Sequence, residues 1–190
     1  MKKIKRALIS ISDKKDLKSL LNILKKNDVE IISSGGTYKE IKKLKFKCIE
    51  ISKFTGSPEI LDGRVKTLHP KIHAGILNKR NNKLHNQDLK KYNFKNIDLV
   101  VVNFYPFEET LKNSFNHKKI IENIDIGGPT MVRAAAKNYN DVAVITSRSQ
   151  YDDLINEMDK FKGSTSENFR KKMSQIAFTE TAYYDALISN

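Results

Sequence analysis

The segment from Gly63 to Gly75 holds the densest set of groups that bind anions or move protons. It reads Gly-Arg-Val-Lys-Thr-Leu-His-Pro-Lys-Ile-His-Ala-Gly. Arg64 offers a planar fork of donors that suits a phosphate or a carbonyl, whereas the ammonium of Lys66 is a compact point charge. The segment therefore predicts a site for an anionic substrate at which protons move.

Two histidines in this segment raise the question of a metal. His69 and His73 are four residues apart, a spacing that on one helix would place both on the same face as ligands. However, no Glu follows His69 to complete the zinc-protease pattern, and Pro70 disfavours an uninterrupted helix. We therefore expect no metal site, and we expect the histidines to be structural or to orient a substrate.

A glycine-rich turn provides a second candidate site. Ser33-Ser34-Gly35-Gly36-Thr37 lies between an expected strand and an expected helix. Glycine N–H groups, hydroxyls and the start of a helix can converge there on a phosphate. Lys14, at the end of the first expected strand, could add a cation. An ordinary turn with a Thr cap would leave the same pattern.

The third candidate has two parts. Asn103-Phe104-Tyr105-Pro106-Phe107 ends an apolar run, and Asp125-Ile126-Gly127-Gly128 leads into an expected helix. The glycine pair before a helix repeats the anion-site pattern, with the Asp125 carboxylate beside it. Ala134 to Ala136 would let another element approach closely, or serve plain helix packing.

These sites must be positioned by alternating strands and helices. Apolar runs predict strands at residues 6–11, 29–32, 46–51, 97–103 and 142–146. Helical spacing predicts helices from a cap at Asp13 to about 27, and at 38–45, 118–123, 129–138, 150–160 and 167–188, with a small helix in an exposed loop at 78–96. This order predicts a three-layer αβα sandwich with a mainly parallel sheet, in which ligands bind beyond the carboxyl ends of the strands.

The totals fit one domain. The chain has 190 residues, 39% hydrophobic and 30% charged, with no apolar run long enough to cross a bilayer and no signal-peptide pattern. The one cysteine, Cys48, cannot form an internal disulfide, so we expect a cytoplasmic protein. The net charge of +13 is nearly all lysine and spread along the chain, and no nucleic-acid-binding motif accompanies it. We read it as a solvated surface around an anionic-ligand pocket.

Seven motifs, in this order, resemble the cyclohydrolase domain of bifunctional purine-biosynthesis proteins. They are S-x-S-D-K (Ser10 to Lys14), S-S-G-G-T (Ser33 to Thr37), T-G-x-P-E (Thr55 to Glu59), G-R-V-K-T-L-H-P (Gly63 to Pro70), H-A-G-I-L (His73 to Leu77), N-x-Y-P-F (Asn103 to Phe107) and I-D-I-G-G-x-T…R-A-A-A-K-N (Ile124 to Asn138). The fourth is highly specific, whereas the second is not. The resemblance covers essentially the whole chain and implies a methylglyoxal-synthase-like fold.

The resemblance implies an activity: ring closure of 5-formamidoimidazole-4-carboxamide ribonucleotide to inosine monophosphate (IMP) with loss of water. It implies no cofactor and no metal for this step, and a nucleotide as the ligand, with no nucleic-acid or membrane partner. It leaves a homodimer open. Family members usually continue into a transformylase domain, and this chain stops at Asn190, so we expect a single domain over residues 1–190, either excised or stand-alone.

The resemblance also implies roles for individual residues. Catalysis would fall to Lys137 as proton donor and acceptor, to Lys66 as the stabiliser of the oxyanion, and to Asp125 and Tyr105 as partners. The ribose phosphate would be surrounded by Ser12, Asp13, Lys14, Ser34, Gly35, Gly36 and Thr37. The base would be lined by Arg64, Lys66, Thr67, Val102, Asn103, Asp125 and Ile126, next to Gly127 and Gly128. If 129–137 is a straight helix, Lys137 would lie roughly 12 Å along its axis from the glycine turn.

Three rival interpretations remain. A regulatory domain that senses nucleotides would explain S-S-G-G-T, but it would leave four residues without a role: Lys66, Tyr105, Asp125 and Lys137. Methylglyoxal synthase is a rival enzyme, but its W-D-P type of segment is missing, since the chain has no Trp. Nucleic-acid binding would rest on net charge alone.

Overall fold

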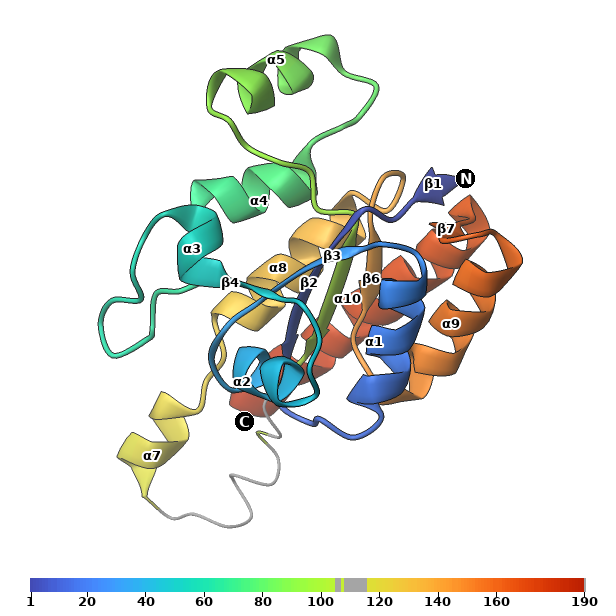
Figure 1. Cartoon of the computed structure of the whole chain (residues 1–190). Helices are drawn as coiled ribbons and strands as arrows, with labels where there is room; N and C mark the ends of the chain where they lie inside the picture. The colour runs from blue at the N-terminus through green and yellow to red at the C-terminus, as the bar shows by residue number, and fades with distance from the viewer. Residues whose placement is uncertain (105–106, 108–115, 190) are drawn as a thin grey trace.

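Five parallel strands form the centre of the molecule. The computed structural model describes residues 1–104, 107 and 116–189 (Figure 1). Within these, the main sheet has the order β4-β3-β2-β5-β6. Its strands are β2 (Arg6–Ile11), β3 (Glu30–Ser33), β4 (Ile49–Glu50), β5 (Leu99–Asn103) and β6 (Ala143–Ile145). The sheet confirms the predicted parallel architecture.

The strand order reverses direction between β2 and β5. From β2 the chain moves outward to β3 and β4, then returns to the other side of β2 to form β5 and β6. β2 and β5 pair in parallel register from Ala7↔Leu99 to Ile11↔Asn103. Such a switch point opens a crevice beyond the carboxyl ends of the two strands, which is where ligands bind in sheets of this kind.

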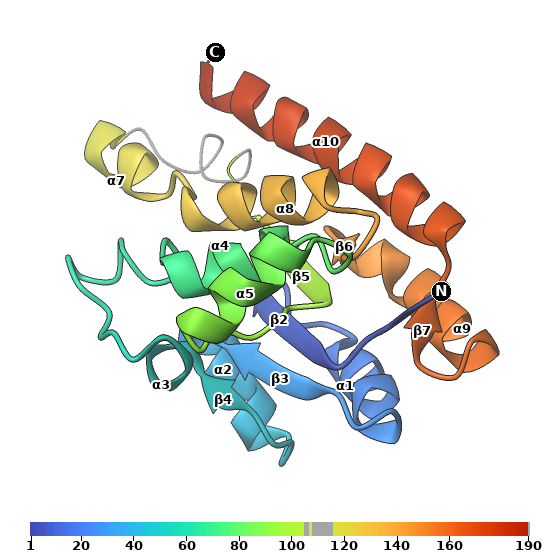
Figure 2. The same cartoon turned by 90° about the horizontal axis from the view of Figure 1, so that it is seen from above.

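Helices cover both faces of the sheet, as Figure 2 shows. α8 and α10 pack together over β5 and β6, with α4 beside α8, while α1 and α2 lie on the opposite face. The helix bounds are α1 (Leu17–Lys26), α2 (Gly35–Lys43), α3 (Ile51–Thr55), α4 (Pro70–Leu77), α5 (Lys83–Lys91), α7 (His117–Glu122), α8 (Gly127–Lys137), α9 (Tyr151–Lys160) and α10 (Glu167–Ser189), with a 3-10 turn, η1 (Arg148–Gln150). The sheet is buried on both faces, which explains why its strands are continuous apolar runs.

Most predicted elements are confirmed within a few residues, and the differences are local. Helix α2 begins at Gly35, so the two glycines form its first turn rather than a preceding loop. The predicted strand 46–51 pairs only at Ile49–Glu50. The predicted cap of α1 was wrong: the helix starts after Asp16, while the Asp13 carboxylate accepts the backbone N–H of Lys15 (2.9 Å) in a local turn.

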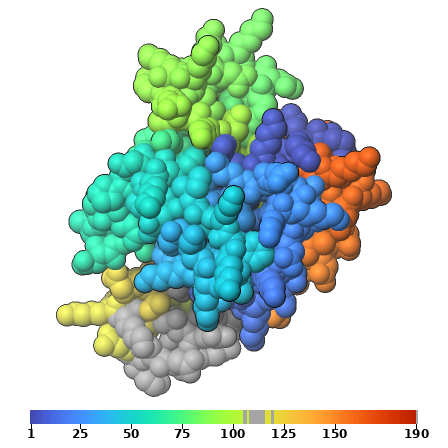
Figure 3. Space-filling model, in the orientation of Figure 1, coloured from blue at the N-terminus to red at the C-terminus, as the bar shows by residue number. Residues whose placement is uncertain are grey.

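Two short elements had no signal in the sequence. β1 (Lys2–Lys3) and β7 (Ser164–Thr165) pair antiparallel as a separate two-stranded sheet. Each is two residues long, too short for any alternation of apolar and polar residues to show. The exposed segment with α5 was predicted, and it projects from the body of the molecule at the top of Figure 3. None of the helices in the described part of the chain has the length and apolar character needed to cross a membrane.

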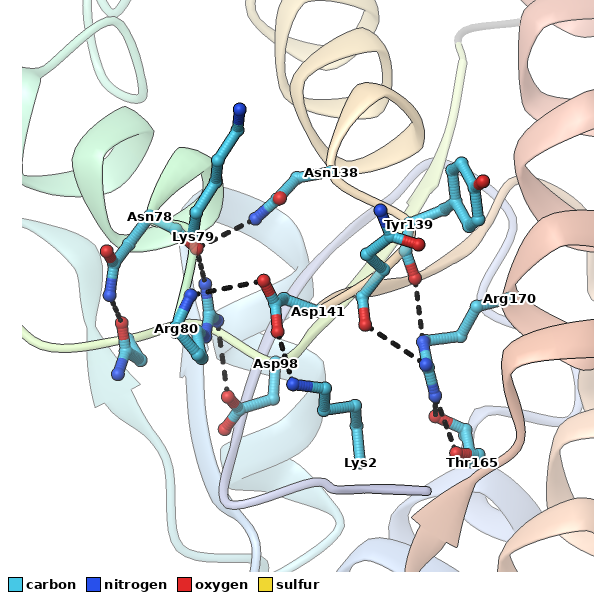
Figure 4. A network of polar contacts seen from close by, with 12 residues as sticks. Lys2, Asn78, Lys79, Arg80, Asp98, Asn138, Tyr139, Asp141, Thr165 and Arg170 are labelled. Carbon is cyan, nitrogen blue, oxygen red and sulfur yellow. Dashed lines mark hydrogen bonds and ion pairs between the residues drawn. The ribbon is translucent and has the colours of Figure 1, made fainter. Parts of the chain in front are cut away.

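A polar network closes the amino-end side of the sheet, opposite the crevice (Figure 4). Asp98, just before β5, accepts the backbone N–H groups of Lys5 and Arg6, both at 3.0 Å, and pairs with Arg80 at 3.3 Å. Asp141, just before β6, pairs with Lys2 at 2.6 Å and accepts the N–H of Arg80 at 3.1 Å. These carboxylates tie the starts of β2, β5 and β6 together.

The Arg170 side chain is the largest polar group in the interior, with 2% of its surface exposed. Its guanidinium donates to the backbone carbonyls of Tyr139 (2.7 Å), Asn140 (3.0 Å) and Thr165 (2.6 Å), as Figure 4 shows in part. Burial lowers the pKa of Arg170. The residue joins α10 to the turn before β6 and to β7, so it fixes the position of α10.

Candidate active site

A cavity of about 880 Å³ opens at the carboxyl ends of β2, β3 and β5. Most of the predicted binding residues line it, although they come from distant parts of the sequence. They are Ser12, Lys14, Ser34, Gly35, Gly36, Thr37, Arg64, Lys66, Thr67, Asn103, Asp125, Ile126, Gly127 and Gly128. The volume suits a nucleotide-sized ligand.

Positive charge gathers at the start of α2. A methyl group placed on Gly36 would lie 3.8 Å from Lys14 Nζ, and one placed on Gly35 would lie 3.8 Å from Lys66 Nζ. The positive end of the helix dipole points to the same place, and the first turn, Gly-Gly-Thr, has no acidic side chain. An anion bound at this point would be favoured by two ammonium groups and by free helix N–H groups.

The loop from Gly56 to His69 positions Lys66. Ile60 and Val65 pair across a tight turn, in which Leu61, Asp62 and Gly63 all have positive φ. The Lys66 side chain lies across Gly63, where a methyl group would come within 2.6 Å of Cε. The positive φ of 85° favours glycine at position 63, and a side chain there would displace the end of Lys66. Lys66 Nζ also pairs with Glu59 at 3.4 Å.

Arg64 spans the mouth of the cavity. Its guanidinium makes a two-pronged pair with Glu122 at the end of α7, with Nε to Oε1 at 3.1 Å and Nη2 to Oε2 at 2.6 Å. Both side chains are largely exposed, so the pair links the 56–69 loop to α7 without being buried. The guanidinium fork predicted for a ligand is thus occupied by a carboxylate of the chain.

Asp125 occupies the start of α8. Its Oδ1 accepts the N–H of Gly128 at 2.9 Å, and the carboxylate fills the space that a side chain at position 128 would need. Burial raises the pKa of Asp125, against the opposing effect of hydrogen bonds from the N–H groups of Gly128 and Gly127. The anion expected at this glycine pair is the protein's own carboxylate.

Ser12 and Asn103 hold the ends of β2 and β5 together. Asn103 Oδ1 accepts the N–H of Ser12 (2.6 Å) and lies 2.9 Å from its hydroxyl. Thr37 performs a similar task from α2, since its hydroxyl donates to the Ile11 carbonyl at 2.9 Å and accepts the Ile11 N–H at 3.0 Å. These residues line the cavity, but much of their hydrogen-bonding capacity shapes its wall.

The two histidines have structural surroundings. His69 is the N-cap of α4, with Nδ1 accepting the Lys71 N–H at 3.1 Å and Nε2 lying 3.2 Å from the Ser57 hydroxyl. Burial lowers the pKa of His73. Pro70 begins the helix, so His69 lies outside it. Among the described residues, no group of three or more His, Cys, Asp and Glu side chains gathers as a metal site would require.

Three predicted site residues do not line the cavity, and a fourth cannot be placed. Lys137 is the last residue of α8, exposed and about 15 Å along the axis from Gly127. It does not line the cavity of its own chain, and its proposed catalytic role stays a prediction. Asp13 points away and lies 3.9 Å from Arg148 Nε, and Val102 is buried within β5. Tyr105 lies outside the described residues.

The structure also shows lining residues that the sequence did not indicate. Two of them, Leu68 and Ile121, are exposed apolar residues that form a rim on the cavity together with Ile126, which was predicted. Glu59 and Glu122 were missed because their relevance depends on which lysine or arginine they reach in space. Burial raises the pKa of the Cys48 thiol to about 12, which disfavours the reactive thiolate.

Two family matches cover nearly the whole chain. The family described as MGS-like domain matches residues 16–130, more than half of the chain, and that described as AICARFT/IMPCHase bienzyme matches residues 135–190. The first match contains most of the residues that line the cavity, and the second contains α9 and α10. The resemblance inferred from the motifs is confirmed.

Similar proteins extend this result. The "Bifunctional purine biosynthesis protein PurH" of Bradyrhizobium diazoefficiens is 47% identical over 100% of this chain, and that of Ruminiclostridium cellulolyticum is 49% identical over 98%. The chain spans 36% of the length of each. A solved structure, "Crystal structure of ForH", superposes with a TM-score of 0.87 at 28% identity, covering 97% of this chain and 95% of that one. By the match over residues 16–130, the chain belongs to the family of MGS-like domains.

Proposed function

We propose that this chain is an IMP cyclohydrolase, which closes the ring of 5-formamidoimidazole-4-carboxamide ribonucleotide to give IMP and water. The observation that carries the proposal is the cavity itself. It brings Lys14 and Lys66 to the start of α2, and the half-buried Asp125 carboxylate lines the same cavity. The similarity to PurH proteins supports it. The protein would act in the cytoplasm on a free nucleotide, without a cofactor.

The two ends of the cavity suit the two ends of this substrate. The ribose phosphate, a dianion, would bind at the N–H groups of Gly35 and Gly36 with Lys14 beside them. The base would extend toward Thr67 and the Asp125 turn, past the apolar rim.

The chemistry needs orientation and charge stabilisation. The carboxamide nitrogen, a weak nucleophile, attacks the formyl carbon of the same molecule, and the formyl oxygen gains negative charge. The Lys66 ammonium would stabilise that oxyanion, and Asp125 would accept a proton from the attacking nitrogen. The former formyl oxygen then takes back the proton held by Asp125 and gains the proton of the formamide nitrogen, and it leaves as water while a carbon–nitrogen double bond forms to that nitrogen. Holding the two reacting groups in contact supplies a further part of the acceleration.

Incubation of the chain with the formylated ribonucleotide tests the proposal directly. IMP should appear, as measured by absorbance and mass spectrometry, with no metal or folate added. A chain that binds IMP but forms none from the precursor would be a nucleotide sensor of the same fold. Formation of methylglyoxal from dihydroxyacetone phosphate would instead favour the other enzyme.

Replacing Asp125 by Asn should separate activity from stability. We expect kcat to fall by about 10²-fold, because Asn cannot accept the proton. The thermal stability of the variant should instead increase at neutral pH. Since the pKa of Asp125 is raised in the folded state, the wild type loses stability as pH rises from the ordinary value of 3.8 through the raised value.

The Asp125→Asn variant lacks this loss, and its amide oxygen can still accept the Gly128 N–H. It should therefore melt at a higher temperature than the wild type at neutral pH, with the difference shrinking toward pH 3. Thermal melts from pH 3 to 8 measure this. A variant that is less stable than the wild type at neutral pH would show that the ionised carboxylate is not penalised by burial.

A further inference from the structure

Tyr184 is a buried residue near the site that the mechanism does not use. It lies on α10, 4% exposed, and it is not among the residues that line the cavity. Its hydroxyl oxygen accepts the backbone N–H of Asp125 at 2.7 Å. This contact joins residues 59 positions apart in the sequence.

The Asp125 turn is thereby held at two points. On one side its carboxylate accepts the N–H of Gly128 at the start of α8 (2.9 Å). On the other side its own N–H donates to Tyr184 on α10. A carboxylate held only through α8 could rotate with the turn, whereas the second contact fixes the backbone that carries it.

The Tyr184 ring also contacts the opposite wall of the site. Its centroid lies 4.9 Å from that of Phe104, in a tilted arrangement. The Phe104 carbonyl accepts the Ser12 hydroxyl at 2.9 Å, and the preceding residue, Asn103, lines the cavity. One side chain thus contacts both the Asp125 turn and the end of β5.

We propose that Tyr184 is a positioning residue, which sets the distance between the Asp125 carboxylate and the phosphate-binding side of the cavity. The inference rests on the proposed cyclohydrolase function. Because Tyr184 itself does not reach the ligand, its effect must pass through the Asp125 turn and through Phe104. Loss of its hydroxyl would leave the ligand bound but misalign the carboxylate.

Tyr184→Phe tests this, since it keeps the ring and removes only the hydroxyl. We expect kcat to fall about tenfold to 10²-fold with KM within about threefold of the wild type, as for a displaced catalytic group. Hydrogen exchange of the Asp125 amide should speed up about tenfold, while exchange at Val132, inside α8, stays unchanged. The matched control is Tyr183→Phe, which removes a hydroxyl from the neighbouring, 55% exposed tyrosine.

The outcomes separate the two proposals. An inactive wild-type chain would overturn the cyclohydrolase function and this inference with it. An active wild type with an unaltered kcat in Tyr184→Phe, or with equal loss in Tyr183→Phe, would overturn the positioning role alone. Unchanged exchange at the Asp125 amide would do so as well, whatever the kinetics.

Discussion

Lys66→Met is expected to lower kcat by about 10²-fold to 10³-fold, as removal of a group that stabilises an oxyanion does. The methionine keeps the length and the apolar stem of the side chain that lies across Gly63, so the loop should retain its shape. Steady-state kinetics on the formylated substrate, with a circular dichroism spectrum to verify folding, measures the effect.

The matched control is Lys71→Met, in the same segment of sequence. Lys71 does not line the cavity, and its ammonium lies over the Phe54 ring at 5.5 Å. Its replacement should leave kcat within about twofold, because an exposed cation–π contact contributes only about 0.5–1 kcal/mol to stability. Equal losses in both variants would mean that Lys66 acts through general charge rather than at the reacting oxygen.

Arg170→Met should reduce the free energy of unfolding by about 3–5 kcal/mol, which is a large effect for one substitution. The carbonyls of Tyr139, Asn140 and Thr165 would lose their donor, and the hydrogen bond to the Thr165 carbonyl, which is fully buried, would be lost without a replacement. Urea denaturation measures the change.

Arg133→Met is the control for this second variant. Arg133 lies on the exposed face of α8, with its guanidinium 5.7 Å from the Phe178 ring. We expect a change of less than about 1 kcal/mol there. A loss of the same size at both positions would argue that removal of positive charge, rather than of the Arg170 hydrogen bonds, destabilises the protein.

The fold was largely predictable because its signals are local and repeated. The run from Leu99 to Asn103 is apolar at nearly every position, and only a central strand buried on both faces needs that pattern. The order of elements then specified a parallel sheet, and the rule for switch points placed the cavity. Pairings of two residues, such as β1 with β7, carry no periodicity and could not be predicted.

The sequence predicted most of the residues that line the site, but it did not predict the contacts that they make. Glycines that precede a helix indicate an anion site, but the same pattern at Gly35 and at Gly127 has two outcomes: one helix start is open and the other holds Asp125. Likewise, Arg64 has the right chemistry for a ligand but pairs with Glu122. Such choices depend on distances between segments, which a single sequence does not contain.

Lys137 shows the same limit from another side. A continuous helix from Gly127 to Lys137 places its two ends about 15 Å apart, at about 1.5 Å of rise per residue. In the structure α8 is such a helix. The motif R-A-A-A-K-N lies in a helix, as predicted. The distance from Lys137 to the cavity, however, depends on whether that helix is continuous, which only the structure shows.

The Asp125 carboxylate at the start of α8 puts negative charge at one end of the cavity, whereas the start of α2 is positive. A phosphate that approached this end would meet Asp125 where the helix N–H groups are already engaged, and two like charges at about 4 Å repel strongly in a half-buried setting. At the start of α2 the same phosphate would meet the Lys14 ammonium and the positive end of the helix dipole. Under the proposed function, we therefore expect a nucleotide to enter with its phosphate toward α2 and not in the reverse orientation, so that its direction is selected before any contact with the base is made.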